Sequence, residues 1–258
     1  MRPVAADPAA SSRIEILGCP VDALSLEETV EQCRRLIADR SGAIQVSINA
    51  LKVALAHDDE RFRQLLDSFE IASADGMPVV WASRLLRPPL PGRVNGTDLM
   101  YELIAAAERD GSTVYLLGAR EQVLDAAIAR LRIDHPGLRI AGSHHGYFRP
   151  EEEGEVVREI SDASPDILFV ALPSPRKEWF LAGNAPRLDV GLAMGVGGSI
   201  DVLAGLHSRA PRWMQRAGLE WLFRLLRDPL GMWRRYLRTN TRFVALLAAE
   251  AYARARRK

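Results

Sequence analysis

The sequence has few of the residues that cross-link small proteins through disulfides or that bind metal ions. Among 258 residues it has two cysteines, Cys19 and Cys33, whose spacing excludes a disulfide scaffold and a four-cysteine zinc site. The five histidines show no metal-ligand spacing, and no Asp-x-Asp pair is present to hold Mg²⁺ or Mn²⁺ against a diphosphate. We therefore predict neither a metal nor another cofactor, and unpaired thiols fit a reducing cytoplasm.

Long apolar runs are also missing. No window holds eighteen apolar residues without charges, so we expect no membrane-spanning helix. Residues 1–12 lack the apolar core of a secretory signal, so none is expected there.

The net charge of +1 conceals a strong asymmetry. Ser208–Lys258 carries 13 basic and 3 acidic residues, whereas the preceding part has 21 basic and 30 acidic residues. An acidic body with a basic end indicates an anionic partner, which can be a membrane, a nucleic acid or a phosphorylated substrate. The sequence character changes near Leu206–Pro211, so we predict a body of residues 1–206 and a helical appendage of residues 207–258.

Within the body, short apolar runs alternate with amphipathic stretches. The predicted strands are Arg13–Leu17, Ala43–Ile48, Glu70–Ala72, Thr113–Leu117, Arg139–Ala141, Ile167–Leu172 and Val190–Met194. The predicted helices include Leu26–Ala38, Asp98–Arg109, Gln122–Arg132 and Glu152–Ile160. Continuous apolar strands that alternate with helices predict an α/β fold with a Rossmann-like, doubly wound, mostly parallel sheet. Ligands bind such sheets at the carboxyl ends of the strands.

Polar side chains follow two early strands. Ser47 and Asn49 end the strand Ala43–Ile48 and can hydrogen-bond a ligand, although a helix cap is the simpler interpretation of Asn49. Asp75 follows the next strand and precedes Gly76, which permits a sharp turn. Its carboxylate can accept a proton from a ligand or cap a helix, and the local sequence favours neither.

The segment Arg93-Val94-Asn95-Gly96-Thr97-Asp98 lies in a loop before a helix that Thr97 or Asp98 can cap. Arg93 suits bidentate contact with a phosphate, and the alternative is a solvated loop arginine.

Two later strand ends carry further candidates. Gly118 permits close approach of a ligand to the backbone. The turn at Pro173 leads into a helix whose first turn holds Lys177 and Glu178. A lysine there opposes the helix dipole unless an anion is bound.

The segment Met194-Gly195-Val196-Gly197-Gly198-Ser199-Ile200-Asp201 predicts a strand, a glycine-rich turn and a helix. Such a turn exposes backbone N–H groups that can hold a diphosphate. The pattern matches neither the dinucleotide fingerprint nor the P-loop, and a tight turn that merely packs is the alternative.

Taken in order, these segments resemble the WecG/TagA/CpsF family of bacterial glycosyltransferases. The motifs that carry the resemblance are Ser47-x-Asn49, Ala74-Asp75-Gly76, Arg93-x-x-Gly96-Thr97-Asp98, Gly118, Gly146-Tyr147-Phe148, Pro173-x-Pro175-x-Lys177-Glu178, Gly195-Val196-Gly197-Gly198-x-x-Asp201, Arg209-Ala210-Pro211-x-Trp213 and Gly218-Leu219-Glu220-Trp221.

The resemblance implies transfer of a sugar from a UDP-sugar to a polyprenyl-diphosphate-linked saccharide, with inversion and without a metal, in synthesis of surface polysaccharide. It implies that Asp75 is the catalytic base and that Ser47 and Asn49 line the pocket. Lys177 departs from the glutamine common in the family. The runner-up function is a non-catalytic protein that binds a nucleotide-sugar or a nucleic acid.

The appendage interleaves tryptophans with arginines. The residues expected to contact phosphate or lipid are Arg209, Arg212, Trp213, Arg216, Trp221 and Arg224. This composition is typical of a helix at an anionic membrane surface, so we expect peripheral attachment to the inner face of the cell membrane. The alternative is an apolar stripe that packs on the body or on another subunit. The aromatic residues sit among leucines, which disfavours nucleic acid as a partner, and the oligomeric state is left open.

Overall fold

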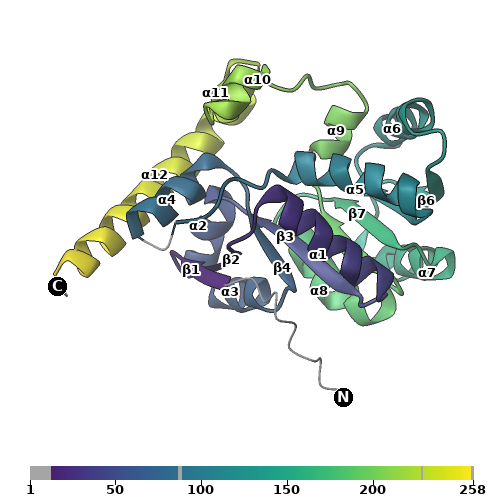
Figure 1. The fold of residues 1–258 in the computed structure, drawn as a ribbon, viewed down its shortest axis with the longest axis horizontal. Coiled ribbons are helices and arrows are strands. Elements are labelled where there is room, and N and C mark those ends of the chain that lie inside the picture. The colour runs from purple at the N-terminus through teal and green to yellow at the C-terminus, as the bar shows by residue number, and fades with distance from the viewer. Residues whose placement is uncertain (1–12, 87–88, 228, 257–258) are drawn as a thin grey trace.

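The structure is a computed structural model that describes residues 13–86, 89–227 and 229–256 (Figure 1). Its centre is a six-stranded parallel sheet with the strand order β4-β3-β8-β7-β5-β6. The strands are β3 (Ala43–Ile48), β4 (Ile71–Ala74), β5 (Thr113–Gly118), β6 (Arg139–His144), β7 (Ile167–Ala171) and β8 (Leu192–Gly195). The predicted doubly wound α/β fold is confirmed.

Helices cover both faces of this sheet. One buried cluster contains Val53, Phe62, Val79 and Phe180. These side chains come from α2 (Ala50–Asp58), α3 (Glu60–Asp67), α4 (Met77–Leu86) and α8 (Arg176–Asn184), and α7 (Glu153–Ala163) packs in the same cluster. The other cluster is built from α1 (Leu26–Ala38), α5 (Gly96–Asp110), α6 (Glu121–Asp134) and α9 (Ser199–Leu203). Short 3₁₀ turns, Pro150–Glu152 and Ala185–Arg187, precede α7 and follow α8.

The first predicted strand forms a separate hairpin. Arg13–Ile16 (β1) pairs antiparallel with β2 (Cys19–Asp22), so it does not join the parallel sheet. The buried carboxylate of Asp22 accepts a 2.7 Å hydrogen bond from the backbone N–H of Ala72, which ties the hairpin to β4.

Polar side chains cap three helices of the body, one of them at a position other than the one expected. Ser25 and Glu28 form a capping box at the start of α1. Asn49 caps α2 by accepting from the backbone N–H of Lys52 at 3.2 Å. The expectation that Thr97 or Asp98 caps α5 is wrong. Asn95 is the cap, because the helix begins at Gly96 and the Asn95 Oδ1 accepts from the N–H groups of both residues.

The appendage consists of α10 (Arg212–Arg216), α11 (Glu220–Arg227) and the long α12 (Pro229–Ala255). In Figure 1, α12 crosses the outside of the body beside α2 and α4. Phe243 is 3% exposed and belongs to the core cluster of that face, and Arg242 pairs with Asp58 at 2.6 Å. The side of α12 that carries Phe243 therefore packs on the body.

Candidate active site

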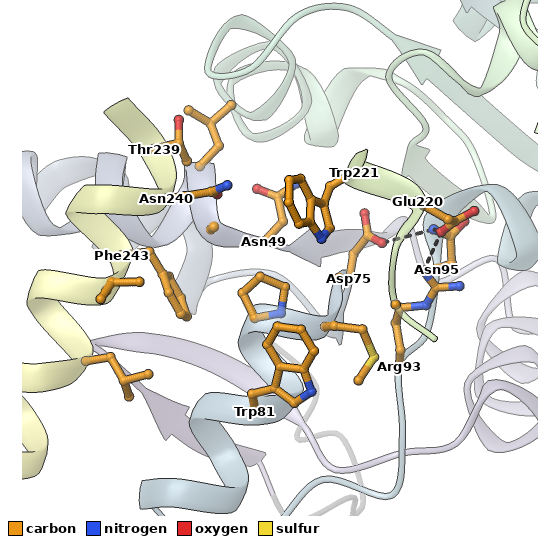
Figure 2. Close-up of a pocket in the computed structure, with 18 residues that line it drawn as sticks. Asn49, Asp75, Trp81, Arg93, Asn95, Glu220, Trp221, Thr239, Asn240 and Phe243 are labelled. Carbon is orange, nitrogen blue, oxygen red and sulfur yellow. Dashed lines mark hydrogen bonds and ion pairs between the residues drawn. The ribbon is translucent and has the colours of Figure 1, made fainter. Parts of the chain in front are cut away.

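The carboxyl ends of β3 and β4 open into a cavity of about 380 Å³ beneath the appendage. Figure 2 shows Asp75 near the Arg93, Asn95 and Glu220 side chains, while Phe243 and Asn240 of α12 lie toward the opposite end. Apolar lining comes from α4 and α12 and includes Met77, Pro78, Trp81, Phe243, Val244 and Leu247. The cavity thus has a polar end and an apolar end, and both the body and the appendage supply its walls.

Asp75 stands at the polar end. Its backbone N–H donates to the carbonyl of Ile48 at 2.8 Å, so the end of β3 fixes the residue that follows β4. The Asn95 Nδ2 donates to the Asp75 Oδ1 at 3.3 Å. Gly76 follows with a φ of +95°, which turns the chain sharply into α4. A half-buried carboxylate held in this way faces whatever ligand enters the cavity.

Ser47 in β3 and Asn49 just after it have different surroundings. Asn49 lines the cavity as well as capping α2. Ser47 is buried, is not among the lining residues, and its Oγ has no hydrogen-bond partner among the described residues. A Cβ placed on Gly96 would lie 3.1 Å from that hydroxyl, so Ser47 faces the start of α5.

A group of ion pairs joins the body to the appendage above Asp75. Arg93 pairs with Glu220, and the Asn95 Nδ2 donates to the same carboxylate at 3.4 Å. Arg209 contacts Asp98 at 2.6 Å and lies 3.9 Å from Glu220. Arg93 is therefore neither solvated nor aimed at an empty site, because an acidic residue of α11 holds it.

The chain passes very close to the body at Gly218, which lines the cavity. A Cβ at this position would lie 2.1 Å from the Met77 Cγ, and the φ of Gly218 is +72°. Only glycine fits both constraints without displacing the start of α4.

A buried charge cluster lies beside the glycine-rich turn. The Nζ atoms of Lys52 and Lys177 lie 3.0 and 3.5 Å from the same Glu178 oxygen. Burial and the nearby Lys52 lower the pKa of Lys177 to about 8, against the opposing pull of Glu178. Burial acts to raise the pKa of Glu178, but the two lysines hold it below its usual value.

The remaining glycine and proline candidates lie along the same sheet edge. A Cβ on Gly118 would lie 2.6 Å from the Ala171 carbonyl oxygen, so the close approach at this glycine comes from β7. Pro173 is exposed just after that strand. Gly197 and Gly198 form the turn after β8, and Asp201 follows in the first turn of α9. Thr97 links this turn to α5, since its Oγ1 lies 2.8 Å from the Ser199 Oγ.

Large apolar side chains of the appendage remain at the surface. Trp213 is 65% exposed, and Trp221 lines the cavity while staying partly exposed. The side chains of Arg212, Arg216 and Arg224 lie outside the described part of the structure. None of the described helices is long and apolar enough to cross a membrane. Within the same residues, no cluster of three or more His, Cys, Asp or Glu side chains is placed to hold a metal ion.

Sequence reasoning missed Glu220, Lys52 and the apolar wall around Phe243 as parts of the site. Glu220 carried one local signal, because it is among the few acidic residues of a strongly basic segment. Lys52 and Phe243 carried none, since helical periodicity does not tell which neighbour a buried face meets.

Comparison with known proteins identifies the family of the chain. The model of the Glycosyl transferase WecG/TagA/CpsF family matches residues 14–257. An N-acetylglucosaminyldiphosphoundecaprenol N-acetyl-beta-D-mannosaminyltransferase of Bacillus spizizenii is 35% identical over 209 residues, which cover 81% of this chain and 80% of the relative. The enzyme of the same name from Bacillus subtilis is 32% identical over 204 residues, 79% of this chain and 78% of its own. The chain therefore belongs to the WecG/TagA/CpsF family and is a glycosyltransferase.

Proposed function

We propose that this glycosyltransferase moves an N-acetylmannosaminyl group from a UDP-sugar to an N-acetylglucosamine linked to polyprenyl diphosphate. The names of the two relatives describe this acceptor type and this transferred sugar. The product would serve synthesis of a bacterial surface polysaccharide. Family membership favours catalysis over the alternative of a protein that only binds a nucleotide-sugar or a nucleic acid.

The observation that carries the proposal is the half-buried Asp75 carboxylate at the polar end of the cavity. Asp75 would take the proton of an acceptor hydroxyl while that oxygen attacks the anomeric carbon. The bond from that carbon to the UDP oxygen breaks on the opposite face, so the configuration inverts. The departing diphosphate carries away the electron pair, and no metal is part of the proposed step.

Several residues would hold the substrates around this reaction. Asn49 and Asn95 line the cavity beside Asp75 and offer amide groups to sugar hydroxyls. Gly197 and Gly198 would expose backbone N–H groups to the donor diphosphate, and Gly195 would leave room for the Lys177 side chain beside them. The remaining candidates would support this edge of the sheet without contacting the substrates: Ser47, Thr97, Asp98, Gly118, Pro173, Glu178 and Asp201. Arg93 and Arg209 would supply positive charge to a diphosphate if they exchange Glu220 and Asp98 for it.

The apolar end of the cavity suits the first isoprene units of the acceptor. Its wall includes Trp81 and Val244, which are also exposed at the surface, so a chain can leave toward a bilayer. We propose that residues 207–258 dock this opening on anionic lipid at the inner face of the membrane. Each basic residue near such a surface contributes about 1 kcal/mol, and Trp213 and Leu226 would enter the interface.

Release of UDP tests the reaction. With a UDP-sugar and lipid-linked acceptor, Asp75→Asn is expected to lower the rate by about 100-fold or more, the usual contribution of a general base. Asp134→Asn is the matched control, because Asp134 lies on α6 and its ion-pair partner is the exposed Arg130. Full activity of Asp75→Asn would contradict the assignment of the base.

Sedimentation with vesicles tests the docking. Because Phe243 is part of the core, point substitutions are cleaner than removal of the appendage. Replacing Trp213 and Leu226 with serine is expected to reduce binding to anionic vesicles at least tenfold, since both large side chains are exposed. Replacing Ile133, an exposed apolar residue of α6, should leave binding unchanged. Equal sedimentation of the appendage variant and the parent would refute docking through this surface.

A further inference from the structure

Two of the three lysines in the chain meet at one buried carboxylate. Lys52 on α2 and Lys177 on α8 both approach the same oxygen of Glu178, at 3.0 and 3.5 Å. All three residues are buried, and Lys177 is 6% exposed. The other Glu178 oxygen has no hydrogen-bond partner among the described residues. Two ammonium groups thus share one carboxylate in a place where water screens little.

The side chain of Lys177 runs along the glycine-rich turn. A Cβ on Gly195 would lie 2.6 Å from the Lys177 Cε, so the glycine at this position makes room for the lysine. A Cβ on Gly197 would lie 3.9 Å from its Nζ. The ammonium therefore ends beside the turn after β8, whose Gly198 is exposed to solvent.

The charged groups around Lys177 do not fully balance its positive charge. Lys52 repels it from α2, Glu178 attracts it from its own helix, and Asp75 attracts it from the end of β4. Asp201 on α9 is a further acidic group near the turn. Its Oδ2 would lie 3.7 Å from a Cβ placed on Gly198. Lys52 lies closer to the shared Glu178 oxygen than Lys177 does, at 3.0 Å against 3.5 Å, and it also donates to the Ser47 carbonyl at 2.6 Å. The Lys177 ammonium is thus compensated incompletely, and a diphosphate at the turn would complete the compensation.

We propose that the Lys177 ammonium binds the donor diphosphate at the Gly195–Gly198 turn, and that donor binding draws a proton from solvent onto this lysine. The inference rests on the proposed use of a UDP-sugar. It gives the buried Lys177 a role that requires an ionisable side chain, because only such a group can take up the proton.

Protonation of Lys177 and binding of the diphosphate favour each other, and this determines how the affinity changes with pH. In the free protein burial lowers the pKa of Lys177 to about 8, so the amine is partly neutral in mildly alkaline solution. A bound diphosphate favours the charged form and raises that pKa. If the bound value exceeds 10, the affinity falls about tenfold between pH 7 and pH 9. The last proton of a terminal phosphate leaves near pH 6, so the ligand charge barely changes in this range.

The small number of lysines makes the test direct. With lysine labelled at the ¹³Cε position, the full chain gives three signals, and Lys177→Gln identifies the one from Lys177. This signal is expected to titrate near pH 8 in the free protein and above pH 10 with saturating UDP. Calorimetry at pH 8 in buffers of different ionisation enthalpy should show uptake of about half a proton by UDP binding. In Lys177→Gln the uptake should disappear and the UDP affinity should stay constant from pH 7 to pH 9.

The outcomes separate this inference from the function on which it rests. UDP binding with an unchanged Lys177 signal, or with the same pH dependence in Lys177→Gln, overturns the inference and leaves the proposed donor intact. Failure of the parent protein to bind UDP at any pH overturns both. Lys177→Arg is the second variant, since its charge is permanent. It should bind UDP without proton uptake, and uptake in this variant would also overturn the assignment.

Discussion

Replacing Lys177 with methionine is expected to stabilise the ligand-free protein at pH 7. Methionine keeps an unbranched side chain of similar length against Gly195 and leaves the Lys52–Glu178 pair in place. The pKa of Lys177 falls from 10.5 in the unfolded chain to about 8 in the folded protein. This difference means that the buried charge destabilises the folded state by about 3 kcal/mol below pH 8.

The pH dependence carries the sign of the effect. Between about pH 8 and pH 10.5 the unfolded chain binds more protons at Lys177 than the folded protein does, so this residue makes stability rise with pH there. The methionine variant lacks that rise. The free energies of unfolding of parent and variant should therefore differ most at pH 7 and converge toward pH 10.5.

Denaturant unfolding at pH 7, 8, 9 and 10 measures this difference, and thermal scans at pH 7 should show a midpoint about 6 °C or more higher in the variant. Arg130→Met is the matched control, because Arg130 is an exposed residue of α6 and its change should stay within about 0.5 kcal/mol. The reasoning about a destabilising buried ammonium would be refuted if the variant had a lower free energy of unfolding than the parent at pH 7. It would also be refuted if the two free energies differed by the same amount at every pH.

Two further predictions concern packing. Gly195→Ala should lower stability, because the new methyl group meets the Lys177 side chain at 2.6 Å, and adding Lys177→Ala should restore much of the loss; equal loss in single and double variants, measured by urea unfolding, would contradict this contact. Phe243→Ala should cost about 3–5 kcal/mol in unfolding free energy, whereas its neighbour Val244, which is 62% exposed, should tolerate alanine within about 0.5 kcal/mol. A loss at Phe243 as small as the one expected at Val244 would mean that α12 does not pack on the body.

Much of the body could be predicted because local signals and the global fold agree there. The apolar run that forms β7 and the capping box of Ser25 each depend on residues close together in sequence. The placement of β1 could not be predicted, because its separation from the parallel sheet depends on pairing with β2 and on the distant Asp22–Ala72 hydrogen bond. The cap of α5 was misplaced, since Asn95, Thr97 and Asp98 are all residue types that cap helices and the sequence does not show that the helix begins at Gly96.

The candidate site was predictable where it follows from the topology of the sheet. Residues after parallel strands meet at one edge, which is why Asp75 and Asn49 lie in one cavity. Contacts between distant segments left no such pattern. Arg93 and Glu220 are 127 residues apart, and the basic composition around Glu220 gave no indication of which arginine it holds. The burial of Lys177 depends equally on a glycine that the sequence shows only as part of a turn.

The close passage of Gly218 over Met77 has a consequence for protein engineering. A chimeric enzyme could carry the last fifty residues of one relative on the body of another. Its two parts would then meet at a surface where even one added methyl group at Gly218 would overlap Met77. A working graft must transfer Gly218 and Glu220 with their counterparts Met77 and Arg93, or the cavity wall will not close. The two parts are thus expected to diversify together rather than be exchanged as independent modules, and acceptor preference should be inherited with the pair.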